Sequence, residues 1–447
     1  MVYIQGLWVL LTIVFFFFRL RIGLCLYVAY IFMVPYMNIR LGVNLQWNFV
    51  NMLLLGAFVK DFLKQKKVKF NLGVLLPFFV LYLFLFFEIP FQEDVPLGYS
   101  LNEFRISAMG TLILPMVLWN VARYDEHLVS NLRMTVLLCI IFIMGYGLFI
   151  AYLGGGVNPY LLLVQTVNGV EFNESYIQVS GGRLFGRISS VFAHPMTYGM
   201  FLSLSVVYMF SIKKKLSKWK IWSLMIMGVV SVLLCGIRTP IGTLMVSFAL
   251  YLLLNMRIKL LIQCSVFVLS IILFICLIPD LDSYVGSIFV SNSNDVSGSS
   301  IEMRFEQLGG CFTEISNSPI FGKGYSWANY YHSLKGDHPV ILAFESLLFV
   351  VLCNNGFLGL VVWTIVFGKV ILKSFKLRVP REESIMLCIL TITYLVYSLI
   401  TGEYGYMKYY LIFFTLMMLE AREYGKTTKK NEESKGSSIL PSPVSSV

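Results

Sequence analysis

Long apolar stretches separated by short polar ones make up most of the chain. Runs such as "LLPFFVLYLFLFF" contain no charged residue and no alternation of apolar and polar positions, so they do not fit transmembrane strands. Stretches approaching the 20 residues that a helix needs to cross the hydrocarbon core of a bilayer recur along the sequence. We place them near 2–18, 22–38, 43–59, 71–89, 106–122, 134–153, 189–210, 221–236, 241–254, 260–279, 341–367, 385–400 and 409–420. The pattern therefore predicts an all-α, polytopic membrane protein with about 12 or 13 transmembrane helices.

Composition leads to the same class. Of 447 residues, 57% are hydrophobic and only 13% are charged, and the mean hydropathy is +0.77. These values lie far outside the range of soluble domains.

The loops between the predicted helices alternate between loops with many Lys and Arg residues and loops with few. One set of loops holds most of the 35 Lys and Arg residues, which predicts that this set is cytoplasmic. Basic loops beside anionic lipid headgroups account for the net charge of +11, so we expect membrane lipid and no nucleic acid as partner. The other set holds Arg40, Arg105, Arg183, Arg187, Arg238, Arg304, Lys323, Lys335 and Lys408. Arginine predominates there, and its planar fork suits bidentate binding of phosphate or carboxylate.

This topology predicts six parts. They are N-terminal transmembrane helices (1–153), a first outer loop (154–188), central transmembrane helices (189–279), a large outer loop (280–340), C-terminal transmembrane helices (341–420) and a disordered cytoplasmic tail (421–447). A polar loop as long as 280–340 inside a compact protein is usually functional or disordered.

The large outer loop carries two recognisable features. Ile301, Phe305, Leu308, Phe312 and Ile315 recur at helical spacing, which predicts an amphipathic helix lying on the membrane or on the bundle. The following "SPIFGKGYS" is typical of a turn whose two glycines let the backbone approach another part of the molecule closely.

Signatures of soluble enzymes and of metal sites are absent from the sequence. No GKS/GKT phosphate loop and no GxGxxG occur, which argues against transport driven by the protein's own ATP hydrolysis. Most of the eight cysteines lie inside apolar runs, and Cys311, the one in an outer segment, has no partner at a readable spacing. The four histidines form no metal-binding spacing, so we expect no metal and no cofactor.

Three outer arginines lie near predicted membrane level, where a charge without a partner is costly. Arg187 precedes "ISSVFAHP", Arg238 stands in "CGIRTPIG" with almost no loop around it, and Arg304 begins the amphipathic helix. If they converge, they form a site for a pyrophosphate. Simpler roles stay open: Arg187 extending to lipid headgroups, and Arg304 pairing with a Glu of its own helix. His194 fits hydrogen-bonded packing better than base catalysis.

Four stretches in order resemble the O-antigen ligase and Wzy-type polymerase family of bacterial inner-membrane enzymes. They are "GRISSVFAHPMTYG", "GIRTPIG", "MRFEQLGGCFTEISNSPIFGKGYS" and "FESLLFVVLCNNGFLGL", within residues 180–365. The resemblance implies about twelve helices and a large periplasmic loop before the last few. It also implies that Arg187, Arg238 and Arg304 hold the pyrophosphate of an undecaprenyl-linked glycan, and that Gly322 and Gly324 belong to the family's "P-x-x-G-x-G" turn. By residue type, Tyr325 and His194 are further candidate binding residues; an interfacial aromatic belt is the alternative for Tyr325.

The sequence departs from this family at its histidine. Ligases of the family place the presumed base about eleven residues before a "G-x-x-G" pair, here Gly356 and Gly359. The residue at that spacing is Glu345, whereas His338 lies further upstream. Either Glu345 or His338 is thus the candidate catalytic base, and Glu345, which favours a polymerase over a ligase, is preferred. A simple ion pair between Glu345 and an arginine is the alternative.

The resemblance implies inverting, metal-independent transfer of undecaprenyl-pyrophosphate-linked repeat units into O-antigen or capsule, in the inner membrane and facing the periplasm. A chain-length regulator is a possible partner. An O-antigen ligase that transfers polymer to lipid A-core is the first alternative. A transporter or flippase of an anionic lipid-linked glycan is the alternative from another class; it predicts charges in the middle of helices and internal repeats, whereas the outer charges here gather at one membrane face.

Overall fold

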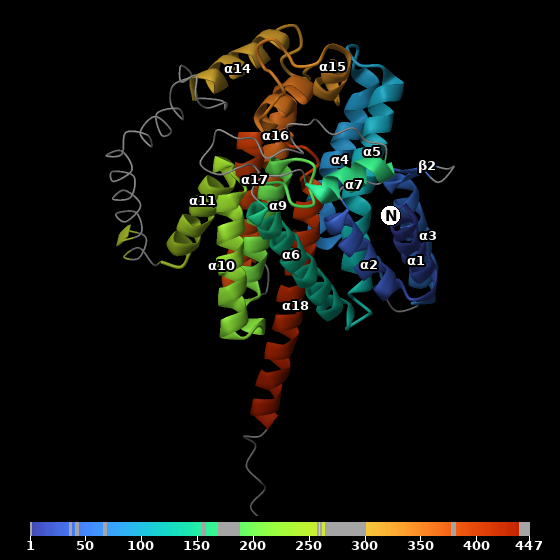
Figure 1. The fold of residues 1–447 in the computed structure, drawn as a ribbon, viewed down its shortest axis with the longest axis vertical. Helices are drawn as coiled ribbons and strands as arrows, with labels where there is room; N and C mark the ends of the chain where they lie inside the picture. Colours follow the sequence, from blue (N-terminus) through green and yellow to red (C-terminus); the bar gives the residue numbers. More distant parts are fainter. Residues whose placement is uncertain are drawn as a thin grey trace, which may run out of the picture.

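The fold is taken from a computed structural model. It describes residues 2–34, 38–40, 44–65, 69–153, 158–168, 188–256, 259, 262–263, 301–376 and 381–437. The helices are α1 (Val2–Phe18), α2 (Leu20–Met33), α3 (Trp47–Lys64), α4 (Leu76–Glu88), α5 (Leu97–Val121), α6 (Leu128–Tyr152), α7 (Pro159–Asn168), α9 (Pro195–Ser211), α10 (Lys218–Leu234), α11 (Arg238–Leu254), α14 (Ile301–Glu314), α15 (Trp327–Lys335), α16 (Leu347–Lys376), α17 (Arg381–Thr401) and α18 (Met407–Ser437) (Figure 1). Short 3₁₀ turns η1 (Gly73–Leu75), η2 (Ile89–Phe91) and η3 (Lys213–Lys215) and a two-stranded ribbon of β1 (Asn38–Arg40) and β2 (Asn44–Gln46) complete the described fold.

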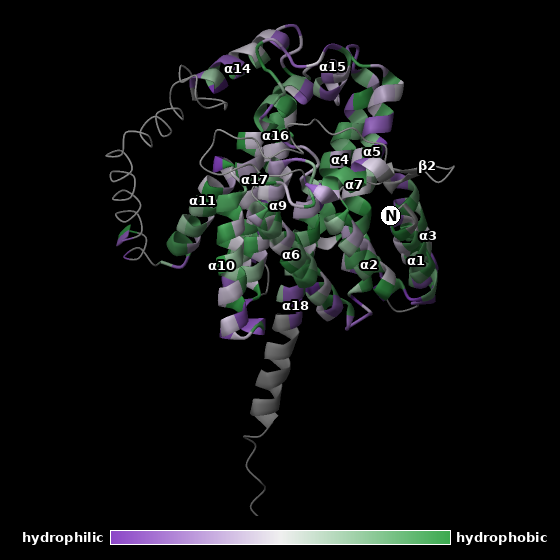
Figure 2. Ribbon diagram, viewed as in Figure 1, coloured by the Kyte–Doolittle hydropathy of each residue, from purple (hydrophilic) through white to green (hydrophobic). Residues whose placement is uncertain are grey.

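The helices confirm the predicted all-α membrane architecture. Five of the described helical segments are long and apolar enough to cross a membrane: Gly73–Phe91, Leu97–Val121, Leu128–Tyr152, Leu347–Lys376 and Arg381–Thr401. Three shorter apolar helices, within α1, α2 and α11, accompany them. Hydrophobic residues fill the middle of the bundle and polar residues gather toward its ends (Figure 2). The chain is a multi-pass membrane protein.

Among the described helices, α5 and α18 extend well beyond the apolar stretches that predict them. α5 begins at Leu97, directly after Pro96, whereas the sequence predicts a span at 106–122. Its first turns carry polar residues, so a search for apolar stretches leaves them out. α18 continues to Ser437, so the segment from residue 421, predicted to be disordered, is helical that far. Lys and Glu are good helix formers, which allows a polar segment to continue a helix.

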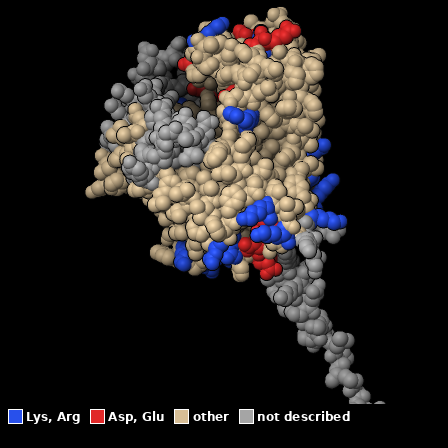
Figure 3. Space-filling view, turned by 90° about the vertical axis from the view of Figure 1, so that its right-hand side faces the viewer, with Lys and Arg blue, Asp and Glu red and all other residues tan. Residues whose placement is uncertain are grey.

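Ion pairs tie the predicted cytoplasmic loops to the last two helices. Glu420 of α18 pairs with Arg133 of α6 at 2.8 Å and also with Lys215. Glu382 at the start of α17 pairs with Lys213 and Lys214, each at 2.6 Å. Figure 3 shows basic groups around an acidic one at this end of the molecule and further charges at the opposite end. We call that opposite end, which the charge pattern predicts to face outward, the outer end.

A separate small core lies at the outer end. α14, α15, the loop that follows α15 and the start of α16 stand above the ends of α9, α11 and α17 (Figure 1). We call residues 301–355 the outer subdomain. Its buried apolar side chains, among them Trp327, Ile341, Phe344 and Phe349, form a cluster distinct from the core of the bundle. α14 occupies the place of the amphipathic helix predicted at 301–315. Leu308 and Ile315 of the predicted apolar face belong to this cluster, whereas Phe305 and Phe312 are exposed.

The break in α16 explains the glycine-rich turn. Gly356 has φ +60° and ψ −158°, a conformation essentially restricted to glycine, and interrupts the helix. The turn from Pro319 to Gly324 lies against this break. The amides of Phe357 and Leu358 donate to the carbonyls of Pro319 and Ile320, and the amides of Lys323 and Gly324 donate to those of Cys353 and Asn354. The turn thus replaces helical hydrogen bonds that the break removes.

Candidate active site

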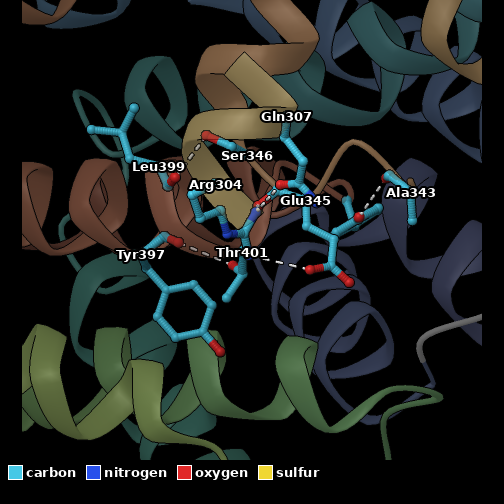
Figure 4. Close-up of polar contacts among 9 residues, drawn as sticks. Arg304, Gln307, Ala343, Glu345, Ser346, Tyr397, Leu399 and Thr401 are labelled. Carbon is cyan, nitrogen blue, oxygen red and sulfur yellow. Dashed lines mark hydrogen bonds and ion pairs between the residues drawn. The ribbon is translucent and has the colours of Figure 1, made fainter. Parts of the chain in front are cut away.

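Arg304 of α14 and Glu345, in the loop before α16, form an ion pair at the outer end. The guanidinium donates to the Glu345 carboxylate at 3.2 Å and to the Glu345 carbonyl oxygen at 2.6 Å (Figure 4). Both side chains stay partly open, with 25% of the arginine and 31% of the glutamate exposed. Burial lowers the pKa of Arg304, and the charge of Glu345 opposes that shift. The pair is therefore a cation and an acid held together and accessible from outside.

Gln307 supports the arginine one helical turn further along α14. Its amide oxygen accepts a hydrogen bond from Arg304 at 3.3 Å, and its side chain is fully buried. Among the described residues its amide nitrogen has no partner. Gln307 thus fixes the direction of the guanidinium from the interior side.

The loop that carries Glu345 has a constrained backbone. Leu342 and Phe344 both have positive φ, at 58° and 53°. The buried Ser346 hydroxyl donates to the carbonyl of Leu399 on α17 at 2.7 Å, and the Tyr404 hydroxyl donates to the carbonyl of Ala343 at 3.0 Å. The outer end of α17 and the α17–α18 linker therefore fix the position of Glu345.

We expect Ser346→Ala to lower both stability and the rate of any reaction that needs Glu345. The substitution leaves the Leu399 carbonyl and the Leu348 amide, which donates to the hydroxyl at 3.2 Å, without their partner. Such a loss costs about 1–2 kcal/mol. Thermal unfolding in detergent together with an activity assay tests this. Ser333→Ala is the control, because Ser333 is exposed and its hydrogen bonds, to the Tyr330 carbonyl and the Tyr99 side chain, do not involve the loop of Glu345. Equal effects of both changes would contradict the expectation.

Sequence reasoning missed the contribution of the α17–α18 linker, "TGEYGY". Gly402 and Gly405 have positive φ, which shapes the turn. The Glu403 carboxylate accepts hydrogen bonds from the amides of Met407 at 2.7 Å and Gly405 at 3.1 Å, and so caps the start of α18. Burial raises the pKa of Glu403. Two closely spaced glycines flanking an acid and an aromatic residue were the available signal.

His338 occupies a buried position beneath the same loop. Its Nδ1 accepts hydrogen bonds from the amides of Val340 at 3.2 Å and Ile341 at 3.0 Å. Its Nε2 lies 3.2 Å from the Glu314 carboxylate. Because an Nδ1 that accepts leaves the proton on Nε2, the ring donates to Glu314. Both ring nitrogens are thus engaged in holding the loop.

Arg238 and His194 stand at the starts of two helices, α11 and α9, on the bundle side of the site. Arg238 is the first residue of α11 and is partly buried. His194 caps α9, where its Nδ1 accepts from the amide of Met196 at 3.0 Å. The thiol of Cys235 donates to the carbonyl of Pro195, which joins the two helix starts. Tyr397 of α17 donates to the carbonyl of Met196 at 2.7 Å. Tyr397 and Thr401 of the same helix lie near Arg304 (Figure 4), so α17 runs between the start of α9 and the Arg304 region.

Of the remaining candidate residues, Gly322, Gly324 and Tyr325 have packing roles, and one lies outside the described residues. Gly322 faces the break in α16, where an added Cβ would lie 2.6 Å from the amide of Gly356; at Gly324 it would lie 2.6 Å from Gln92. Tyr325 packs against Phe104 of α5. Arg187 lies outside the described residues. The structure thus brings together Arg304 and Glu345, and it places Arg238 and His194 at the starts of two neighbouring helices, α11 and α9.

Residues 224–364, from α10 to the first half of α16, match the family model for O-antigen ligase. No curated protein matches the chain. The matched stretch contains Arg238, Arg304, His338 and Glu345. It contains the last three of the four sequence stretches on which the resemblance rests, and so supports the resemblance. Residues 224–364 of this multi-pass membrane protein are thus similar to the O-antigen ligase family.

Proposed function

We propose that this protein polymerises undecaprenyl-pyrophosphate-linked oligosaccharide repeat units into a surface polysaccharide, O-antigen or capsule, at the periplasmic face of the inner membrane. The observation that carries the proposal is the ion pair of Arg304 and Glu345, which joins a phosphate-binding side chain to a carboxylate. Both are partly exposed, so a substrate can reach them. The family match supports a glycosyl-transferring enzyme.

In this mechanism the pyrophosphate of the donor binds Arg304, together with Arg238 and Arg187. Positive charge there stabilises the negative charge that develops on the leaving pyrophosphate as the anomeric bond breaks. Binding of the pyrophosphate competes with Glu345 for Arg304 and frees the carboxylate. The carboxylate then accepts the proton of the attacking sugar hydroxyl, which inverts the anomeric centre. We therefore assign the role of base to Glu345, because among the described contacts its carboxylate bonds only Arg304, which the pyrophosphate can displace. His338, which bonds Glu314, has the role of holding the loop.

Analysis of glycolipids in a deletion strain tests the reaction. Loss of long chains, with a single repeat still attached to lipid A-core, supports the polymerase. Loss of all glycan from lipid A-core, with polymer still on its lipid carrier, makes the protein a ligase, the activity that the description of the matching family names. Accumulation of lipid-linked repeats on the cytoplasmic side would instead show a flippase. Complementation with the wild-type chain restores the profile in each case, and co-purification tests a chain-length regulator as partner.

We expect the purified protein to keep its activity in EDTA. Arginine side chains supply the positive charge that metal ions supply in many phosphate-transfer sites. Incorporation of labelled repeat units from a lipid-linked donor, measured with and without chelator, checks this. Activity that chelation abolishes and added metal restores would contradict the proposed mechanism.

A further inference from the structure

Two cysteines meet inside the outer subdomain. Cys311 lies on α14 and Cys353 on α16, and both are fully buried in the same apolar cluster. The thiol of Cys353 interacts with the thiol of Cys311. Both are present as thiols in this structure. Their separation in the sequence gave no reason to pair them.

Neighbouring contacts establish independently that the two helices are in this register. The rings of Phe312 and Phe357, each beside or one turn from a cysteine, stack with their centroids 6.2 Å apart and their planes at 26°. On α14, Leu308 and Ile315 lie on the same face as Cys311 and belong to the same cluster. The two thiols therefore face each other because the helices pack together.

We propose that Cys311 and Cys353 form a disulfide bond in the mature protein. This follows from the predicted orientation, which places the outer subdomain in the periplasm, where disulfides form and persist. The two sulfurs form one bond, each thiol loses its proton, and the two electrons pass to an oxidised protein disulfide of the thiol-oxidoreductase class, which becomes a dithiol. The closed loop contains α15, His338 and Glu345.

The bond would fasten the helix that carries Arg304 to the helix that follows Glu345. A cross-link stabilises mainly by restricting the unfolded chain, and more so when the closed loop is long. The loop from 311 to 353 includes most of the outer subdomain, so the bond would hold that part as one unit. The proposal does not depend on which glycan reaction the protein catalyses, because the bond is detected without an activity assay.

Peptide mapping of the wild-type protein tests the proposal directly. Cells are lysed in denaturant with an alkylating agent and no reductant, and the digested protein is analysed by mass spectrometry. We expect a peptide containing Cys311 linked to one containing Cys353, which separates on reduction. Cys139 and Cys388, buried in membrane helices, are internal controls that should be alkylated. Alkylation of Cys311 and Cys353 in the unreduced sample would overturn the proposal.

Thermal unfolding gives a second, independent test. Reductant should lower the unfolding midpoint of the wild-type protein but leave that of the Cys311→Ala/Cys353→Ala double variant unchanged. Each single variant should lower the midpoint nearly as much as the double variant, because either change removes the same bond. A wild-type midpoint that does not respond to reductant under denaturing heat would contradict the disulfide.

Discussion

Glu345→Gln is expected to lower the rate of glycan polymerisation by about 100-fold or more, the usual contribution of a positioned general base. Glutamine keeps the shape of the side chain and can still accept a hydrogen bond from Arg304, but it cannot take a proton. Because the neutral amide competes less strongly for Arg304 than the carboxylate does, donor binding should be retained or become tighter. The two effects together distinguish a base from a residue that only holds the arginine in place.

The measurement is a kinetic assay with purified protein and a lipid-linked donor, which gives kcat and KM separately. Glu306→Gln is the matched control, since Glu306 is an exposed acid on the same helix as Arg304. It should leave both constants unchanged. If Glu345→Gln raised KM and left kcat unchanged, Glu345 would be a structural partner of Arg304 and the proposed role would be wrong.

Arg304→Lys complements this experiment. Lysine keeps the charge but loses the planar fork that contacts both the carboxylate and the carbonyl oxygen of Glu345. We expect the lysine variant to show weaker donor binding and a rate between those of the wild type and Arg304→Ala. In the double variant with Glu345→Gln the losses should not add, because the two side chains act as one unit.

Much of the membrane architecture could be predicted from sequence because it rests on local hydropathy. The apolar spans follow from the length of apolar runs. The amphipathic helix at 301–315, with Arg304 near its start, follows from helical periodicity within about one helix length. Helix ends were less predictable where polar residues continue a helix, as at Leu97 and beyond residue 421. In those places helix propensity and capping, rather than burial in the membrane, set the boundary.

The candidate site was only partly predictable, because it depends on contacts between distant segments. The family resemblance singled out Glu345, and an ion pair with an arginine was one expectation for it, but only the fold shows that this arginine is Arg304. The contacts of Ser346 with Leu399 and of Tyr404 with Ala343 join the loop of Glu345 to the end of α17 and the linker after it, more than 50 residues away. Local sequence patterns cannot predict contacts over such separations. His338 illustrates the reverse: a histidine before the helix fits a base by sequence, whereas its ring nitrogens are engaged in holding the loop.

Gly356→Ala is expected to have the largest effect on stability of any single substitution considered. The conformation of Gly356 costs a residue with a side chain about 1–3 kcal/mol. An added Cβ would also lie 2.4 Å from the carbonyl oxygen of Ile320 and 2.6 Å from the amide of Gly322. Because these are backbone atoms, the turn must move away and give up its hydrogen bonds to Phe357 and Leu358. We expect a total loss of about 3 kcal/mol or more.

Gly368→Ala provides the control within the same helix, because an added Cβ at Gly368 meets no atom within 4 Å. Alanine in a helix interior is favoured over glycine, so this change should leave stability unchanged or raise it slightly. Detergent-solubilised variants compared by size-exclusion profile and thermal midpoint give the answer. A Gly356→Ala midpoint equal to that of Gly368→Ala would show that the turn does not seat in the break of α16. A large loss of stability confined to Gly356→Ala, with polymerisation lost as well, would instead show that the packing of this turn in the break holds the outer subdomain in place over the membrane bundle.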